Sequence, residues 1–201
     1  MLIEHDGKRP VVAASAYVAP TAVLCGEVTV GEDARILFGA VLSADGGAVE
    51  IGKGCIVMDN AVVRGREGYP AALGEHVLIG PHAHVNGALI EHDVFVATGA
   101  SIFPGARVGA RSEVRVNAVV HVNSVLPEQA VVPIGWIAAG DPAQLFAPQA
   151  HDELWPVQLG LDFPGTVFGI AREDFTMAKV STHYAELFGR HRHDKVLGDA
   201  W

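Results

Sequence analysis

"IEHDVF VATGAS IFPGAR VGARSE VRVNAV VHVNSV LPEQAV VPIGWI", residues 90–137, repeats every six residues. Each block begins with an aliphatic residue, and most blocks have a small residue two places before the next block. This period is typical of a short strand followed by a corner, with the aliphatic side chain pointing inward. Three such blocks close one triangular coil, and stacked coils bury their aliphatic side chains in a continuous column. An ordinary β-sandwich has no fixed six-residue period.

The same repeat extends back to Val18, with three interruptions: three extra residues before Ile51, about four within residues 64–72, and one missing before Ile90. Repeats over about 120 residues predict a mostly β protein of six or seven coils, within a β-helix domain at residues 1–139. The aliphatic residues that begin the blocks, here called the heads, are Val18, Leu24, Val30, Ile36, Leu42, Ile51, Val57, Val63, Leu73, Ile79, Val85, Ile90, Val96, Ile102, Val108, Val114, Val120, Leu126 and Val132.

Composition changes after the coils. We expect residues 140–201 to be a C-terminal arm and an α-helix that pack on the β-helix as part of the same domain. Residues 140–170 are rich in proline, glycine and aromatic residues, which predicts an extended arm. Residues 172–191 predict the helix, with Glu173 and Asp174 in its first turn and Gly189 as its C-cap. The apolar side chains at helical spacing are Phe175, Ala178, Tyr184, Leu187 and Phe188. The apolar side chains of the arm, which predict contact with other subunits, are Leu145, Phe146, Trp155, Phe163 and Phe168.

The overall composition limits the class of protein. The formal net charge is −9 and the few basic residues are scattered, which disfavours nucleic-acid binding. No apolar run approaches the roughly 18 residues of a membrane span, so we expect a soluble, cytoplasmic protein without a membrane partner. Cys25 and Cys55 do not form a disulfide framework, and each is expected to be a small buried side chain.

Three segments carry a resemblance to a known family. They are "GAVLSADGGAVEIG" (residues 39–52), "MDNAVV" (residues 58–63) and "AAGDPAQLF" (residues 138–146). Together with the lengths of the interruptions, they resemble the gamma-class carbonic anhydrases over residues 10–148. The resemblance implies a left-handed β-helix, a homotrimer with its site between subunits, and a C-terminal helix packed on the coils.

The resemblance fails at the metal site. The three zinc-binding histidines of the family fall on Arg64, Pro81 and Asn86 of this chain. Arginine stays protonated and has no lone pair to offer, proline has no side-chain donor atom, and an asparagine carbonyl is a poor zinc ligand. We therefore expect no zinc at the family position and assign no cofactor.

Two carboxylates of the family pattern remain, Asp45 and Asp59, whereas Ser43 stands where the family has an arginine. Arg64 is expected one coil above Ser43, within reach of Asp45 or Asp59. Such a pair would stabilise the fold at the former metal position. The alternative is a cleft in which Arg64 binds a small anionic ligand through a carboxylate or phosphate.

The segment "LIGPHAHVNG", residues 78–87, holds two further histidines beside this position. His82 is expected at an exposed corner, like His76 and His92. His84 should point outward near the site, and the two could begin a relocated metal site across a subunit contact. Strand alternation predicts an outward column of residues that follow the heads on one face: Ser43, Arg64, Asn86, Phe103 and His121.

Three functions remain open. The first is a trimeric binding or assembly protein with a degenerate site. The second is a coenzyme A-dependent acyltransferase, with His84 or His121 as general base. The third is a metalloenzyme with relocated histidine ligands. The candidate site, in a cleft between subunits, comprises Ser43, Asp45, Asp59, Arg64, Pro81, His82, His84 and Asn86.

Overall fold

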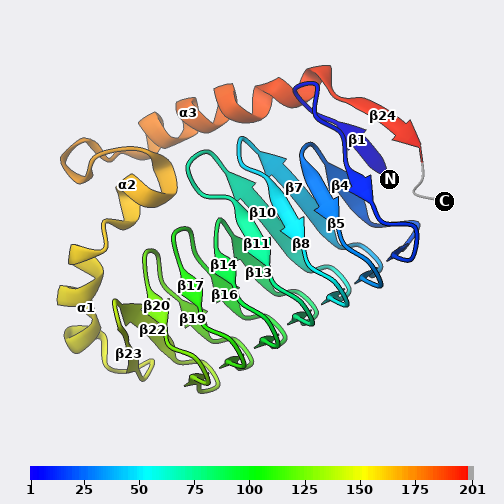
Figure 1. Cartoon of the computed structure of the whole chain (residues 1–201). Helices are drawn as coiled ribbons and strands as arrows, with labels where there is room; N and C mark the ends of the chain where they lie inside the picture. Colours follow the sequence, from blue (N-terminus) through cyan, green and yellow to red (C-terminus); the bar gives the residue numbers. More distant parts are fainter. Residues whose placement is uncertain (199–201) are drawn as a thin grey trace.

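The computed structural model describes residues 1–198 and shows a three-faced parallel β-helix, with the C-terminal helices along one side (Figure 1). The parallel strands of the first face are β1 (Leu2–Glu4), β4 (Val23–Cys25), β7 (Val41–Asp45), β10 (Val62–Arg66), β13 (His84–Asn86), β16 (Ser101–Ile102), β19 (Val119–Val120) and β22 (Ile137–Gly140). Two antiparallel strands close its edges, β23 (Ala143–Phe146) beside β22 and β24 (Lys195–Gly198) beside β1.

The other two faces are seven-stranded parallel sheets. One contains β2 (Val11–Val12), β5 (Val28–Val30), β8 (Val49–Ile51), β11 (Ala71–Leu73), β14 (Leu89–Ile90), β17 (Arg107–Val108) and β20 (Val125–Leu126). The other contains β3 (Tyr17–Val18), β6 (Arg35–Ile36), β9 (Ile56–Val57), β12 (Leu78–Ile79), β15 (Phe95–Val96), β18 (Glu113–Val114) and β21 (Val131–Val132).

Every predicted head is buried and belongs to one hydrophobic core. On the first face the heads pair in register through successive coils, as Leu42 with Val63, Val63 with Val85, and Val85 with Ile102. This face has eight parallel strands rather than the expected six or seven, because β1 and β22 extend the stack beyond the clear repeats.

The corners explain several of the histidines. The third residue before a head often has a left-handed backbone, which favours glycine, asparagine and aspartate. His76 (φ 57°) and His82 (φ 56°) occupy this position and are exposed, as predicted. His92 stands just before the left-handed residue Asp93, and its Nδ1 lies 2.9 Å from the Asp93 carboxylate. These side chains lie at corners because the repeat places them there.

The two longer interruptions lengthen β7 and β10. These strands pair over five residues, from Val41 opposite Val62 to Asp45 opposite Arg66. A bridge between Gly46 and Arg66 continues the contact beyond the strands. The extra residues therefore carry β7 past the normal corner and place Asp45 on the outer surface of the first face.

The prediction of an extended arm at residues 140–170 was wrong. This segment contains α1 (His151–Gly160) and α2 (Phe163–Phe168). Leu154 of α1 packs with Phe146 in a small cluster of its own, so tertiary burial outweighs the weak helix propensity of the segment. Pro164 lies in the first turn of α2, where a missing backbone N–H costs no helical hydrogen bond.

The predicted C-terminal helix is α3 (Met177–Gly189), flanked by the short 3₁₀ segments η1 (Arg172–Asp174) and η2 (Arg190–His193). It runs along the coils toward the N-terminal end of the prism (Figure 1). Glu173 and Asp174 precede α3 instead of forming its first turn, because Thr176 caps it by accepting a hydrogen bond from the Lys179 N–H. No helix within residues 1–198 is long and apolar enough to cross a bilayer.

The inward stripe of α3 differs in part from the prediction. Val180 is its buried residue, Tyr184 and Leu187 are half-buried, and Ala178 is exposed. Val180, Tyr184 and Leu187 recur at the four- and three-residue spacing of one helix face. The predicted stripe was therefore displaced at its N-terminal end, because the helix begins after Thr176.

Gly189 is not the predicted left-handed C-cap, since its φ is −59° and the cap is Arg190. A Cβ at Gly189 would meet nothing within 4 Å. We expect Gly189→Ala to stabilise the protein by about 0.5–1 kcal/mol, because alanine loses less backbone entropy in a helix. Urea unfolding measures the change. The control is Gly169→Ala, which also has open space but a φ of 65°, and which should destabilise. Destabilisation by both would show that Gly189 needs a left-handed backbone.

Candidate functional site

The predicted outward column is present on the first face. Strand register places Ser43 beside Arg64 and Arg64 beside Asn86, and Cys25 extends the column from β4. Farther along the prism, the rings of Phe103 and His121 continue it with centroids 6.3 Å apart. Register alone thus aligns outward side chains from six successive strands, β4 to β19, in one column.

Arg64 forms the predicted ion pair with Asp45. The Arg64 Nε lies 3.0 Å from Asp45 Oδ2, and the Asp45 side chain is only 4% exposed. The Nε–H is not directed along a hydrogen bond to this oxygen, so the contact is an ion pair without a directed hydrogen bond. Ser43 Oγ donates a hydrogen bond of 2.7 Å to Asp45 Oδ1, and His191 Nε2 lies 3.3 Å from the same oxygen. Asp59, the alternative partner, forms no ion pair within residues 1–198.

Helix α3 covers this ion pair. The Arg64 guanidinium lies over the Phe188 ring, 5.6 Å from its centroid, in a favourable cation–π position. The space left is about 20 Å³, room for little more than one water molecule. The crevice is lined by Asp45, Arg64, Arg66, Asn86, Tyr184, Leu187 and Phe188. Arg64 therefore contacts Asp45 and Phe188 of its own chain, while one-third of its side chain remains exposed.

The residues that the resemblance places at the family's metal position do not fit zinc. The guanidinium of Arg64 is engaged by Asp45 and carries no lone pair. Pro81 offers no side-chain donor, and Asn86 Oδ1, which is buried without a hydrogen-bond partner, is a single weak ligand. A zinc site needs three or four strong donors, so no step of a reaction is assigned to zinc here.

His82 and His84 do not gather a metal site within the described part of the chain. His82 is at an exposed corner, whereas His84 is half-buried in β13. Burial lowers the pKa of His84, and the nearby charge of Arg64 lowers it further. Neither belongs to a group of three or more metal-binding side chains within residues 1–198.

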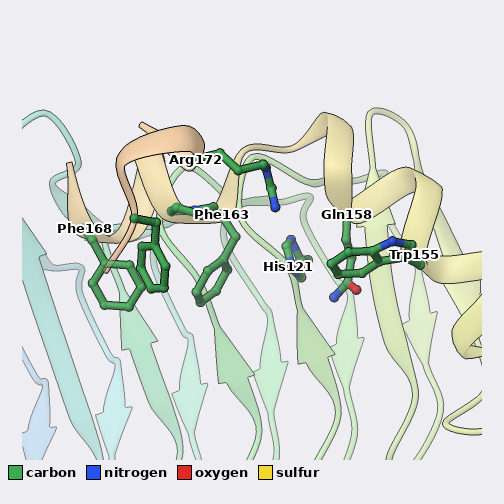
Figure 2. A pocket seen from close by; sticks show the side chains of 8 residues that line it. His121, Trp155, Gln158, Phe163, Phe168 and Arg172 are labelled. Carbon is green, nitrogen blue, oxygen red and sulfur yellow. The ribbon is translucent and has the colours of Figure 1, made fainter. Parts of the chain in front are cut away.

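A second candidate site lies at the other end of the first face, where α1 and α2 meet the coils (Figure 2). It is a cavity of about 390 Å³, here called the aromatic pocket, lined by His121, Trp155, Gln158, Phe163, Pro164, Phe168, Arg172 and Phe175. Figure 2 shows Arg172 above the row of rings, with His121 between Phe163 and Trp155. One basic side chain thus lies beside a largely apolar chamber.

His121 is the buried titratable group of the aromatic pocket. Its ring centroid lies 5.6 Å from that of Phe163, and its Nδ1 is buried without a hydrogen-bond partner. Burial lowers the pKa of His121, and the backbone of Val122 offsets only part of this effect. A neutral imidazole with a free ring nitrogen is the form that accepts a proton.

The lowered pKa of His121 makes stability depend on pH. Below the ordinary histidine pKa of about 6.5, the unfolded chain binds a proton that folded His121 resists, so stability falls as pH falls. His121→Leu should reduce the loss of unfolding free energy between pH 7.5 and pH 5.5 by up to about 1 kcal/mol. Urea unfolding at both pH values measures it, with the exposed His92→Leu as control. An equal loss in His121→Leu and the wild type would contradict the buried neutral state.

Sequence reasoning missed His191 as a site residue, the contact of Phe188 with Arg64, and the packing of aromatic side chains around His121. His191 and Phe188 meet Asp45 and Arg64 only because the tail returns along the whole prism (Figure 1). The one local signal was the histidine-rich stretch "RHRHD" at residues 190–194.

No protein-family model matches the chain. Gamma carbonic anhydrase 1, mitochondrial, of Arabidopsis thaliana is 29% identical over 153 residues, which cover 73% of this chain and 54% of that protein. Carnitine operon protein CaiE of Escherichia coli is 35% identical over 109 residues, which cover 54% of this chain and 56% of CaiE. The chain spans about half the length of the curated relatives it matches.

Among solved structures, a Bacillus cereus protein provisionally named an acetyltransferase aligns with a TM-score of 0.55 and 20% identity. The alignment covers 94% of this chain and 96% of that chain, and at this identity it shows the fold alone. The six-residue period and the stacked heads agree with the β-helix fold of this solved structure. The chain is thus similar in sequence to gamma carbonic anhydrases and to CaiE, and it has the left-handed parallel β-helix fold of hexapeptide-repeat proteins.

Proposed function

We propose that this chain is a trimeric binding or assembly protein, built on a gamma-carbonic-anhydrase-like scaffold whose metal position no longer binds zinc. The observation that carries the proposal is the Arg64–Asp45 ion pair, held at 3.0 Å under α3. A guanidinium at a ligand position supplies positive charge where the scaffold would otherwise hold a cation. In this proposal, the Arg64–Asp45 ion pair stabilises the fold, and no metal-bound water is activated there.

A partly exposed and mostly apolar row supports the trimer. It consists of the residues that precede the inward residues of the first-face strands, and it includes one histidine and one serine: Val23, Val41, Val62, His84, Ser101, Val119 and Ile137. In the arm, Phe146 is buried within its own chain, whereas Leu145 and Trp155 remain exposed. The row and these arm side chains together give the apolar surface that a subunit interface needs.

The test of the proposal is carbon dioxide hydration by protein purified without a metal-binding tag, with and without added zinc. We expect no rate above that of the buffer, because catalysis needs a zinc-bound water on an open coordination position. Light scattering on the same preparation should give the mass of a trimer. Zinc-dependent hydration by the wild type, or a monomer at micromolar concentration, would contradict the proposal.

A gain-of-function variant tests whether the positions are correctly matched. Arg64→His, Pro81→His and Asn86→His together should restore three imidazoles and add bound zinc relative to the wild type. The matched control changes three outward residues away from the site, Arg107→His, Glu113→His and Val131→His. A folded, trimeric triple variant with no added zinc would show that Arg64, Pro81 and Asn86 do not mark the metal position.

The aromatic pocket favours a second candidate function, acyl transfer from an acyl thioester. Its apolar lining suits an acyl chain, Arg172 suits a phosphate, and neutral His121 suits a general base. His121 would accept the proton of an acceptor hydroxyl or amine as that group attacks the thioester carbonyl. The carbon–sulfur bond then breaks, and the coenzyme A thiolate leaves with the proton.

Octanoyl-coenzyme A with hydroxylamine as acceptor tests this second function. Binding is measured by calorimetry, and transfer is measured as the hydroxamate formed. His121→Asn should reduce transfer about 100-fold while binding is retained, because general base catalysis contributes at least that factor. His92→Asn is the control with an exposed histidine. Absence of octanoyl-coenzyme A binding, or an unchanged rate in His121→Asn, would exclude this function for the pocket.

A further inference from the structure

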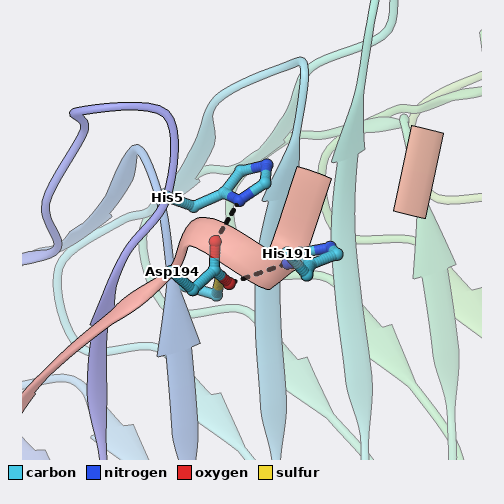
Figure 3. Close-up of side chains that lie close together, drawn as sticks. His5, His191 and Asp194 are labelled. Atoms are coloured by element: carbon cyan, nitrogen blue, oxygen red, sulfur yellow. Dashed lines mark hydrogen bonds and ion pairs between the residues drawn. The ribbon is translucent and has the colours of Figure 1, made fainter. Parts of the chain in front are cut away.

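A compact group of metal-binding side chains lies where the C-terminal tail meets the first coil (Figure 3). His5 follows β1, Cys25 ends β4, His191 lies in η2, and Asp194 precedes β24. One ligand atom from each of these four residues lies within 4.8 Å of all the others. None of the four is at a position that matches a zinc histidine of the family.

The four side chains converge on Asp194. Its Oδ1 lies 2.6 Å from His5 Nδ1, and its Oδ2 lies 2.8 Å from His191 Nδ1 and 3.6 Å from Cys25 Sγ. Tetrahedral zinc, with bonds of about 2.0–2.3 Å, spaces its ligand atoms roughly 3.3–3.8 Å apart. The cysteine distance already fits, and the two histidine contacts need to open by about 0.5–0.7 Å to admit the ion.

The outer nitrogens of both histidines face carboxylates. His191 Nε2 lies 3.3 Å from Asp45 Oδ1, and His5 Nε2 lies 3.7 Å from Asp6 Oδ2. Metal-binding histidines usually donate their second N–H to a carboxylate or carbonyl, which turns the other nitrogen toward the ion. Here each Nε2 lies at ion-pair distance from a carboxylate, without a hydrogen bond, and in both rings the Nδ1 faces the centre of the group.

The site is closed on the side of the first coil, whereas the His191 side chain is 33% exposed. His5 and Cys25 are each 5% exposed, and the rings of His5 and His191 stack with centroids 4.3 Å apart. Asp45, behind His191, is itself fixed by Ser43 and Arg64. Buried polar side chains that converge in this way are ordered before any ligand arrives, which lowers the entropic cost of binding.

We propose that His5, Cys25, His191 and Asp194 bind one zinc ion in a structural site that fastens the C-terminal tail to the first coil. Two imidazoles, a thiolate and a carboxylate suit zinc, whereas calcium and magnesium select oxygen ligands alone. Binding replaces the Cys25 thiol proton, which is released to solvent, and moves each histidine proton to Nε2. Four protein ligands leave no open position, so this zinc does not activate water.

The site links residues that are 189 positions apart, as His5 and Asp194 show. Zinc bound at this site would anchor η2 and β24 beside β1, and would thereby hold the end of α3 over Arg64. A structural ion here would stabilise the folded state by mass action, because the unfolded chain does not bring these ligands together.

The experiment uses full-length protein without a metal-binding tag. The protein is stripped with a chelator and titrated with zinc against a chromophoric competitor, and with cobalt to detect thiolate coordination by its charge-transfer absorption. We expect one zinc per chain, a cobalt–thiolate band, and a melting temperature that rises with zinc. Cys25→Ser, His191→Gln and the isosteric Asp194→Asn should each weaken zinc binding by about 100-fold or more.

The controls separate this site from others. Cys55→Ser removes the other cysteine, His92→Gln removes an exposed histidine, and both should bind zinc as the wild type does. Circular dichroism establishes that each variant is folded, and Asp194→Asn serves where Cys25→Ser does not fold. Failure of the folded wild type to bind zinc would overturn the proposal and leave a hydrogen-bonded network. Binding that survives Cys25→Ser and Asp194→Asn, or is lost in the His82→Ala, His84→Ala double variant, would also overturn it.

Discussion

Leu42→Ala is expected to lower the free energy of unfolding by about 3 kcal/mol. Leu42 is fully buried and lies in register between Leu24 and Val63, so its neighbours above and below cannot close the cavity without breaking the coil stack. The measurement is urea unfolding at fixed protein concentration, because an oligomer couples stability to concentration.

The matched control is Leu89→Ala, a leucine of β14 that is 40% exposed. It points outward one residue before a head and should cost about 1 kcal/mol or less, since little apolar area leaves water there. Equal losses for Leu42 and Leu89 would show that the six-residue phase does not separate inward from outward side chains.

Arg64→Ala should destabilise the protein by about 2 kcal/mol. The substitution leaves the buried Asp45 carboxylate without its guanidinium partner, and breaking a buried pair typically costs about 3–5 kcal/mol. The cost is smaller here because Arg64 is one-third exposed and solvent screens part of the interaction, and because Ser43 and His191 still support Asp45. The change in melting temperature measures it.

Arg115→Ala is the control for Arg64→Ala. Arg115 pairs with Glu113 at 3.1 Å, but both side chains are nearly half exposed, so its loss should cost at most about 1 kcal/mol. Combining Arg64→Ala with Asp45→Asn should cost less than the sum of the two, because the double variant strands no charge. An Arg64→Ala protein as stable as the wild type would show that Arg64 is solvated and unpaired.

The coils were predictable from the sequence because their determinants are local. A head every six residues gave the inward column from Val18 to Val132, and alternation along each strand placed Ser43, Arg64 and Asn86 on one outward line. The ion pair followed from this register, since a long arginine side chain one strand away from Ser43 reaches Asp45. No tertiary information was needed for these steps.

The C-terminal segment was less predictable because its structure depends on what it packs against. The helix α1 contains Pro156 and has little helical amphipathicity, yet Leu154 finds a partner in Phe146 of β23. Likewise, His191 and Asp194 form a local pair three residues apart, but nothing in the sequence indicates that they meet His5. That contact requires the path of α3 back along the prism, which is a property of the whole fold (Figure 1).

Anomalous diffraction at the zinc edge, from crystals of the protein grown with zinc, tests the central claim most directly. The claim is that the Arg64–Asp45 pair has taken the place of the family's metal. We predict no anomalous peak in the space bounded by Arg64, Asn86 and the nearest Pro81, even if zinc binds elsewhere. We also predict continuous electron density joining Arg64 to Asp45. A zinc peak within bonding distance of Asn86 Oδ1, with Arg64 turned away from Asp45, would contradict it.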